Sequence, residues 1–215
     1  LFVNTSTSEV YGSAQYSPID EAHPLNAQSP YAATKISADQ LCLSYYRSFE
    51  LPITVLRPFN TFGPRQSLRA SIPTIISQAL EKKTTIKMGN ISTKRDFSYV
   101  SDTVSGFTSC IDNIKCLGET INLGTGIAFT IEETIKYISE LTNINIKVEV
   151  DKKRLRPAKS EVNHLLSNNL KAKEMLNWEP KFANKEGFKL GLQKTIDWFK
   201  KPENLKLYKS NIYNF

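Results

Sequence analysis

The fold is indicated first by the stretch NTSTSEVYG, residues 4–12. The chain opens with LFVNTS (residues 1–6), which is apolar at first and polar at its end, as in a buried strand. Thr7, Ser8 and Glu9 follow that strand directly, and ligands of open α/β sheets bind beyond the carboxyl ends of parallel strands. Taken alone, such a hydroxyl-rich stretch is more often a loop or a helix cap.

The next stretch, YAATK (residues 31–35), begins nineteen residues after Gly12 and lies near the start of a predicted helix. Ser29 is a favourable N-cap and Pro30 suits the first helical position. The helix is expected to end near residue 49, and ITVL (residues 53–56) is a short β-branched strand. Strand, helix and strand in this order predict a right-handed parallel unit.

The rest of the chain is expected to form shorter elements. Asp102 and Thr130 are each predicted to cap a following helix. Loops are expected at residues 8–29 and 57–65, strands at 84–88, 96–100, 119–124 and 146–150, and helices at 72–80, 103–112, 131–142, 168–176 and 184–199.

Composition is that of an ordinary globular protein: 215 residues, 40% hydrophobic and 23% charged. No apolar run approaches the roughly 18 residues of a membrane span, and no signal peptide is visible. The three cysteines, Cys42, Cys110 and Cys116, form no CxxC pair, so we expect neither a disulfide framework nor a metal site. The sequence thus predicts a reduced, cytoplasmic setting without a membrane partner.

The net charge of +7 includes a basic run at residues 152–159. Such a run is most often a solvated loop. The more specific hypothesis is that this basic run contacts a phosphorylated ligand. A nucleic-acid partner is not expected, because the sequence has no zinc spacing, RNA-binding signature or aromatic–basic repeat.

Tyr31 and Lys35 lie four residues apart and therefore share one face of the predicted helix. A free phenol has a pKa of about 10, and a neighbouring ammonium favours its charged form, which can accept a proton. YxxxK alone is weak evidence, because any long helix can contain it. The hydroxyls and carboxylate of residues 7–9, with RPFN (residues 57–60) after the next strand, favour a catalytic interpretation.

Seven motifs in this order resemble the extended short-chain dehydrogenase/reductase family, in particular its NAD-dependent nucleotide-sugar epimerases and dehydratases. The resemblance covers nearly the whole chain. The motifs are TSEVYG (7–12), SPYAATK (29–35), LRPFNTFGPR (56–65), KRDFSYVSDTV (94–104), INLGTG (121–126), RPAKSEV (156–162) and LKAKEMLNWEP (170–180).

The resemblance implies an α/β fold with two parts and a tail. Residues 1–60 would be the C-terminal portion of a Rossmann-like parallel sheet. Residues 61–200 would be mainly a smaller mixed α/β substrate-binding lobe, with some elements returning to the sheet, and residues 201–215 a tail. Relatives open with strand–GxxGxxG–helix; that pattern is missing here, so we expect an N-terminal truncation of on the order of 100 residues and a fragment inactive alone.

Within the family, Glu9 distinguishes two reactions. The 4-epimerases usually carry a small residue there, whereas 4,6-dehydratases carry an acid that removes the sugar C5 proton. Thr7-Ser8-Glu9 is similar to the GDP-mannose dehydratase pattern, while dTDP-glucose dehydratases read Thr-Asp-Glu. RPFNTFGPRQS with IPTII resembles dehydratases of UDP- or GDP-linked N-acetylhexosamines, which feed nonulosonic acids such as legionaminic acid in cell-surface polysaccharide synthesis.

The implied catalytic residues are Thr7, Ser8, Glu9, Tyr31 and Lys35. The phenolate of Tyr31 would take the proton of the sugar 4-hydroxyl, which Thr7 holds, while C4 reduces NAD. Glu9 would take the C5 proton and return it to the departing C6 oxygen, with Ser8 orienting or relaying. A 4-epimerase and a non-catalytic fragment of the fold remain alternatives.

The resemblance also implies ligand contacts. Arg95 and Arg156 match arginines that hold the diphosphate in this family; Arg65 and Arg69 would either bind the same group or remain solvated. The helix at residues 30–49, apolar on two sides, suits a homodimer. The cofactor NAD would contact Thr5, Ser6, Tyr31, Lys35, Pro58 and Asn60. The nucleotide-sugar would contact Asn60, Met88, Arg95, Asn122, Arg156 and Lys159.

Overall fold

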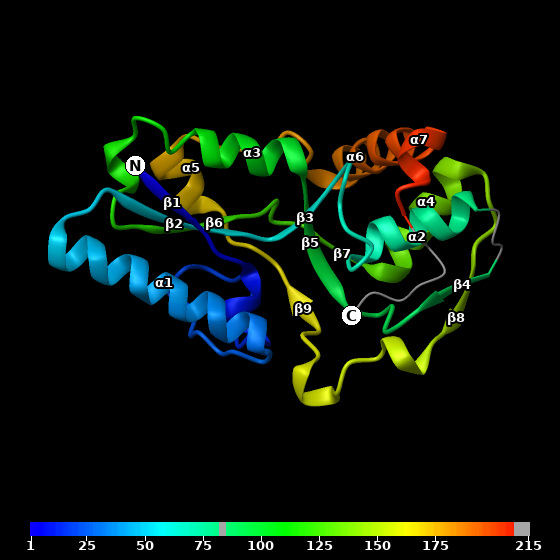
Figure 1. The fold of residues 1–215 in the computed structure, drawn as a ribbon, viewed down its shortest axis with the longest axis horizontal. Coiled ribbons are helices and arrows are strands. Elements are labelled where there is room, and N and C mark those ends of the chain that lie inside the picture. Colours follow the sequence, from blue (N-terminus) through cyan, green and yellow to red (C-terminus); the bar gives the residue numbers. More distant parts are fainter. Residues whose placement is uncertain (82–84, 209–215) are drawn as a thin grey trace.

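The computed structural model describes residues 1–81 and 85–208, and its first layer is a three-stranded parallel sheet (Figure 1). The sheet has the order β1-β2-β6, with β1 at Phe2–Thr5, β2 at Ile53–Pro58 and β6 at Thr120–Leu123. In Figure 1, α1 (Pro30–Phe49) lies along one face, and α3 (Val100–Thr108) and α5 (Leu170–Leu176) lie along the other. The expected parallel strand–helix–strand unit is confirmed.

Local sequence explains the ends of α1. The side chain of Ser29 accepts a hydrogen bond from the Ala32 N–H at 3.1 Å, and Pro30 follows it. The helix ends at Glu50, which adopts a left-handed conformation with φ 54° and donates to the Tyr46 carbonyl. The predicted helix is therefore confirmed at both ends.

A second sheet lies where a loop was expected over residues 57–65. β2 continues through Arg57 to Pro58, and β3 (Asn60–Phe62) pairs in parallel with β5 (Lys94–Tyr99). The expected loop is confirmed at residues 63–65 but is wrong at residues 57–58 and 60–62, because Arg57 is buried beside a carboxylate and Phe62 enters the core, so both sites can continue buried strands. β7 (Ala128–Thr130) and β9 (His164–Leu165) also pair with β5.

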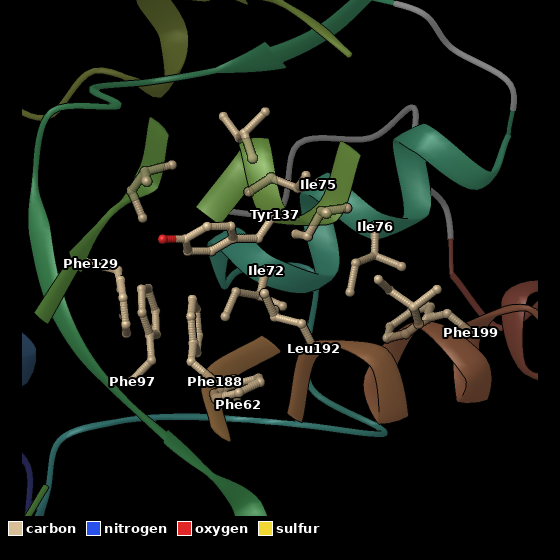
Figure 2. Close-up of a cluster of buried hydrophobic side chains, with 14 of the residues drawn as sticks. Phe62, Ile72, Ile75, Ile76, Phe97, Phe129, Tyr137, Phe188, Leu192 and Phe199 are labelled. Carbon is tan, nitrogen blue, oxygen red and sulfur yellow. The ribbon is translucent and has the colours of Figure 1, made fainter. Parts of the chain in front are cut away.

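Further helices and a pair of parallel strands make up most of the rest of the second half of the described chain. The core there contains Phe188, whose ring stacks on Phe97 and Phe129 with centroid distances of 5.5 and 4.5 Å; Figure 2 shows the three rings side by side. The elements are α2 (Ser71–Leu80), α4 (Ile131–Thr142), α6 (Asn184–Phe199), α7 (Pro202–Leu205), and β4 (Thr85–Met88) in parallel with β8 (Lys147–Val150).

The two predicted caps differ in outcome. Thr130 caps α4 as expected, and the structure adds a capping box with Glu133. Asp102 is not a cap: α3 begins directly after Tyr99, and the buried carboxylate accepts a hydrogen bond from the Phe182 N–H at 2.8 Å. The prediction was wrong because β5 runs into α3 without an intervening loop.

Short 3₁₀ turns interrupt several segments, including the expected loop at residues 8–29. Residue 84 of an expected strand and residues 209–215 of the expected tail lie outside the described residues. Among the helices described, none is long and apolar enough to cross a membrane. The 3₁₀ turns are η1 (Ser8–Tyr11), η2 (Ile114–Cys116), η3 (Lys152–Arg154) and η4 (Ala158–Ser160).

Candidate functional site

The hydroxyl-rich stretch after β1 forms the turn η1. Thr7 is its N-cap, and its Oγ1 accepts a hydrogen bond from the Glu9 N–H at 3.2 Å. The Thr7 O–H remains a donor, because only its acceptor function is used in the cap. Ser8 is buried, whereas Glu9 is half-buried. The stretch is therefore a cap, and it also presents a carboxylate beyond the end of a parallel strand.

Tyr31 and Lys35 lie at the start of α1, beside the same strand end. The Lys35 ammonium donates a hydrogen bond to the Thr5 carbonyl at 2.8 Å. Its nitrogen lies 6.0 Å from the centroid of the Tyr31 ring, and Tyr31 is 52% exposed. The predicted Tyr–Lys pair thus forms next to the carboxyl end of β1, with the aromatic ring open to solvent.

A cavity of about 280 Å³ lies beside η1 and opens between β3, β4 and β5. It is lined by Glu9 and by four of the side chains expected to touch a nucleotide-sugar, Asn60, Met88, Arg95 and Arg156. Residues from widely separated parts of the chain therefore meet in one cavity.

The cavity is rich in charge. Arg95 is buried, and burial lowers the pKa of its guanidinium, while the charges of Glu9 and Glu161 act in the opposite direction. The contact between Arg95 and Glu161 is long, at 3.9 Å. Arg69 and Arg154 also line the wall. A cavity with four guanidinium groups is suited to an anion such as a diphosphate.

Two acceptors in this wall have no partner among the described residues. They are Asn60 Oδ1 and Gln66 Oε1, both buried atoms of cavity-lining residues. The Gln66 amide is fixed in place by its nitrogen, which donates to the Thr61 carbonyl at 2.7 Å. Gln66 and Glu161 were not predicted as site residues, although Gln66 directly follows the motif LRPFNTFGPR, and Arg154 was predicted only as part of the basic run at residues 152–159.

Two residues expected to contact a ligand have buried side chains. The Ser6 hydroxyl donates to Asp39 at 2.8 Å and is turned into the interior. Asn122 is fully buried; its side chain accepts from the Tyr11 hydroxyl at 2.7 Å and donates to the Ile19 carbonyl at 3.2 Å. Both side chains are engaged within the fold, and neither lines the cavity.

Other expected residues lie outside the cavity wall. Tyr31 is not part of the wall, so its phenol and the Glu9 carboxyl do not share one enclosed cavity, although η1 packs against α1. Lys159 is exposed, and Arg65 is exposed with φ 67°, whereas Arg69 lines the wall. Thr5 meets Lys35 through its carbonyl, and Pro58 pairs with Leu123 within the sheet.

Known proteins resemble this chain in sequence. Residues 1–190 match the model of the GDP-mannose 4,6-dehydratase family. UDP-glucuronate 4-epimerase of Thermodesulfobacterium geofontis (strain OPF15) is 35% identical over 211 residues, covering 97% of this chain and 61% of that protein. dTDP-D-glucose 4,6-dehydratase of Homo sapiens is 30% identical over 214 residues, covering 97% of this chain and 58% of that protein.

The fold is shared with solved structures. A dTDP-glucose 4,6-dehydratase from Bacillus anthracis str. Ames, crystallised in complex with NAD, matches with a TM-score of 0.81 and 32% identity, covering 94% of this chain and 62% of that chain. The chain thus spans about three fifths of the length of these relatives. The likeness confirms the expected α/β fold with a Rossmann-like parallel sheet. The chain belongs to the GDP-mannose 4,6-dehydratase family of nucleotide-sugar epimerases and dehydratases.

Proposed function

We propose that the full-length protein is an NAD-dependent nucleotide-sugar 4,6-dehydratase acting on a UDP- or GDP-linked N-acetylhexosamine. The observation that carries the proposal is the position of Glu9. Its carboxylate lines the arginine-rich cavity, and it stands one turn from the strand end where Tyr31 and Lys35 lie. A carboxylate there provides the base that a dehydratase needs and a 4-epimerase lacks.

The residues of this chain fit NAD at the end of β1. Tyr31 exposes its ring to solvent, and the Lys35 ammonium is held at the Thr5 carbonyl, where it adds positive charge beside the phenol. Lys35, Tyr31 and the wall residue Asn60, with its unpartnered oxygen, would hold the cofactor. Bound NAD would supply the redox chemistry, taking up hydrogen from C4 of the sugar and returning it to C6.

The protein groups would move the protons. Tyr31 takes the proton of the sugar 4-hydroxyl, and the free O–H of Thr7 holds that oxygen. Glu9 removes the C5 proton, which the 4-ketone makes acidic, and passes it to the C6 oxygen as water leaves; when hydride returns to C6, a proton from solvent is added at C5. A positioned acid or base contributes roughly 10²–10⁴-fold. Ser8 is buried, so we assign it to the support of Glu9 rather than to contact with the sugar.

The side chains lining the cavity would determine the orientation in which the nucleotide-sugar binds. Arg95 and Arg156 would bind the diphosphate through charge-assisted hydrogen bonds, and Met88 would contact the base. The sugar would then extend past Glu9 toward Tyr31, which lies outside the cavity wall. Lys159, which the structure leaves outside the wall, has no part in this arrangement.

A 4-epimerase is the second candidate, favoured by the 35% identity to the UDP-glucuronate 4-epimerase. Both reactions begin with oxidation at C4, and only the dehydratase breaks the C5–H and C6–O bonds. The fate of the C5 hydrogen therefore distinguishes them.

The test is Glu9→Gln in the full-length protein, assayed in D₂O with a panel of UDP- and GDP-N-acetylhexosamines. Wild type should place deuterium at C5 during formation of a 4-keto-6-deoxy sugar, and the variant should lose this at least 100-fold while retaining nucleotide binding. Glu179→Gln, a surface carboxylate paired with Lys173, is the matched control. Deuterium incorporation at the normal rate in Glu9→Gln would show that Glu9 is not the base.

We also propose a homodimer through α1. Leu41, Tyr45 and Phe49 are 60%, 45% and 67% exposed and follow one another at intervals of four on this helix, and a contiguous exposed apolar patch marks an interaction site. Leu41→Glu should convert a dimer to a monomer in sedimentation experiments, and an unchanged sedimentation coefficient would contradict this interface.

A further inference from the structure

Asp39 is a fully buried carboxylate of α1 that does not line the cavity. Arg57 of β2 pairs with it: Asp39 Oδ2 lies 3.0 Å from Arg57 Nη2 and accepts from Arg57 Nε at 3.1 Å. The same carboxylate accepts from Ser6 Oγ at 2.8 Å and from Asn4 Nδ2 at 2.9 Å. These donors come from β1, from Ser6 directly after it, and from β2.

The spacing along α1 links this carboxylate to the candidate site. Tyr31, Lys35 and Asp39 follow one another at intervals of four, so they share one face of the helix. Lys35 bonds the Thr5 carbonyl, and one turn further Asp39 bonds Ser6, the next residue of the chain. The helix is thus fastened to the end of β1 at two successive points, directly before Thr7.

The network continues to the turn that carries Glu9. Arg57 Nη1 donates to the Tyr11 hydroxyl at 3.0 Å, and that hydroxyl donates to Asn122 of β6 at 2.7 Å. Burial raises the pKa of Tyr11 to about 12, against the opposing charge of Arg57, so the phenol remains a donor at neutral pH. Tyr11 belongs to η1, and the pair thereby connects α1, β1, β2, β6 and η1.

We propose that the Asp39–Arg57 pair is a positioning device for the reaction, setting Tyr31 and Lys35 of α1 against residues 7–9. The inference rests on the proposed function. Stability alone does not account for the pair, because a buried ion pair is often replaceable by apolar residues without loss. What an apolar pair cannot reproduce is the set of directional bonds from three strands and η1.

The first experiment compares Arg57→Lys and Asp39→Asn/Arg57→Gln with wild type in the full-length protein. Arg57→Lys keeps the buried cation but loses the paired geometry at Asp39 and the contact with Tyr11. The double variant removes both charges and leaves none unpaired. If the pair positions the site, kcat falls at least tenfold in each folded variant while KM stays within about twofold, because the cavity arginines are untouched. Wild-type kcat in a folded variant would overturn the proposal.

A second experiment needs no turnover and separates this inference from the proposed function. Lysines of wild type and Arg57→Lys are acetylated with limiting acetic anhydride, and their rates are read by mass spectrometry. Lys35 should react at least threefold faster in the variant, because its bond to Thr5 loosens. Lys171, bonded to Glu119 at 2.8 Å, is the internal control and should not change. An unchanged rate at Lys35 would overturn the positioning claim, even if the protein turns over a nucleotide-sugar.

Discussion

The buried polar groups beneath α1 differ sharply from those in the wall of the cavity. Beneath α1, Asp39 and Arg57 meet at 3.0 Å, and the carboxylate also accepts from Ser6 and Asn4. In the cavity wall, Asn60 Oδ1 and Gln66 Oε1 have no partner among the described residues, and the Arg95–Glu161 contact is 3.9 Å.

This difference indicates two tasks. A buried polar group without a hydrogen-bond partner costs about 1–3 kcal/mol. The groups beneath α1 satisfy one another and fix the positions of the strands and the helix. Those in the cavity wall keep donors and acceptors available, which is suited to a ligand that satisfies them on binding. Mutations beneath α1 should therefore mainly lower stability, whereas mutations in the cavity wall should mainly weaken ligand binding.

The largest effect is expected at Tyr31, on α1, the helix that covers the first region. Tyr31→Phe in the full-length protein should lower kcat by roughly 10²–10⁴-fold, because the phenolic oxygen is the group that takes the C4 hydroxyl proton. Stability should not change, since Tyr31 is half-exposed. Tyr45→Phe on the same helix is the matched control. Product formation by mass spectrometry and folding by circular dichroism check both; a Tyr31→Phe enzyme of normal rate would remove the phenol from the mechanism.

The next effect belongs to the region beneath α1. Asp39→Asn should lower the free energy of unfolding by about 3–5 kcal/mol, because it leaves the buried cation of Arg57 without its counter-ion. Urea unfolding measures the change. The exposed Asp197→Asn, also on a helix, should differ from wild type by less than about 0.5 kcal/mol. If Asp39→Asn and Asp197→Asn were equally stable, the claim that the groups beneath α1 stabilise the fold would be contradicted.

A third expectation concerns pH. Asp96 is fully buried, and burial raises its pKa to about 6, although the hydrogen bonds from Thr125, Gly126 and Ser167 oppose the shift. The folded state then holds a proton that the unfolded chain releases near pH 3.9.

The direction in which stability changes with pH follows from that difference in pKa. The stabilising contribution is complete below about pH 3.9 and is lost as pH rises through 6, by up to about 3 kcal/mol at 1.36 kcal/mol per pKa unit. Unfolding free energies of wild type and Asp96→Asn between pH 4 and 7 should therefore diverge in slope. Parallel curves would contradict a raised pKa at Asp96.

The smallest effect is expected in the cavity wall. Arg95→Met should weaken binding of UDP or GDP by about 10- to 100-fold, since hydrogen bonds to charged groups contribute about 1.5–3 kcal/mol. Isothermal titration calorimetry on the full-length protein measures it. Arg47→Met, an exposed arginine of α1, is the control. Undiminished affinity would show that the anion binds elsewhere.

Local patterns in the sequence were sufficient for much of the fold. The N-cap Ser29, the following Pro30 and the capping box of Thr130 are short-range signals, and each marks a helix start in the structure. The parallel unit followed from element order. The prediction that Asp102 caps a helix was wrong because α3 follows β5 directly, and this depends on tertiary packing.

The site was predicted less completely, since motifs do not reveal which way a side chain turns. Ser6 lies in the candidate stretch yet faces Asp39, a contact 33 residues away along the chain. Asn122 bonds Tyr11 across 111 residues. Gln66 enters the cavity from a loop without periodicity. Such partners become visible only once the strands and helices are assembled.

The central claim is that Tyr31 and Glu9 act on the same sugar. The product that the full-length protein forms tests this claim directly. Incubated in D₂O with UDP- and GDP-N-acetylglucosamine, it should release from at least one of them a nucleotide-linked 4-keto-6-deoxy sugar, lighter by one water and carrying deuterium at C5. A 4-epimer of unchanged mass, with the C5 hydrogen retained, would contradict the dehydratase.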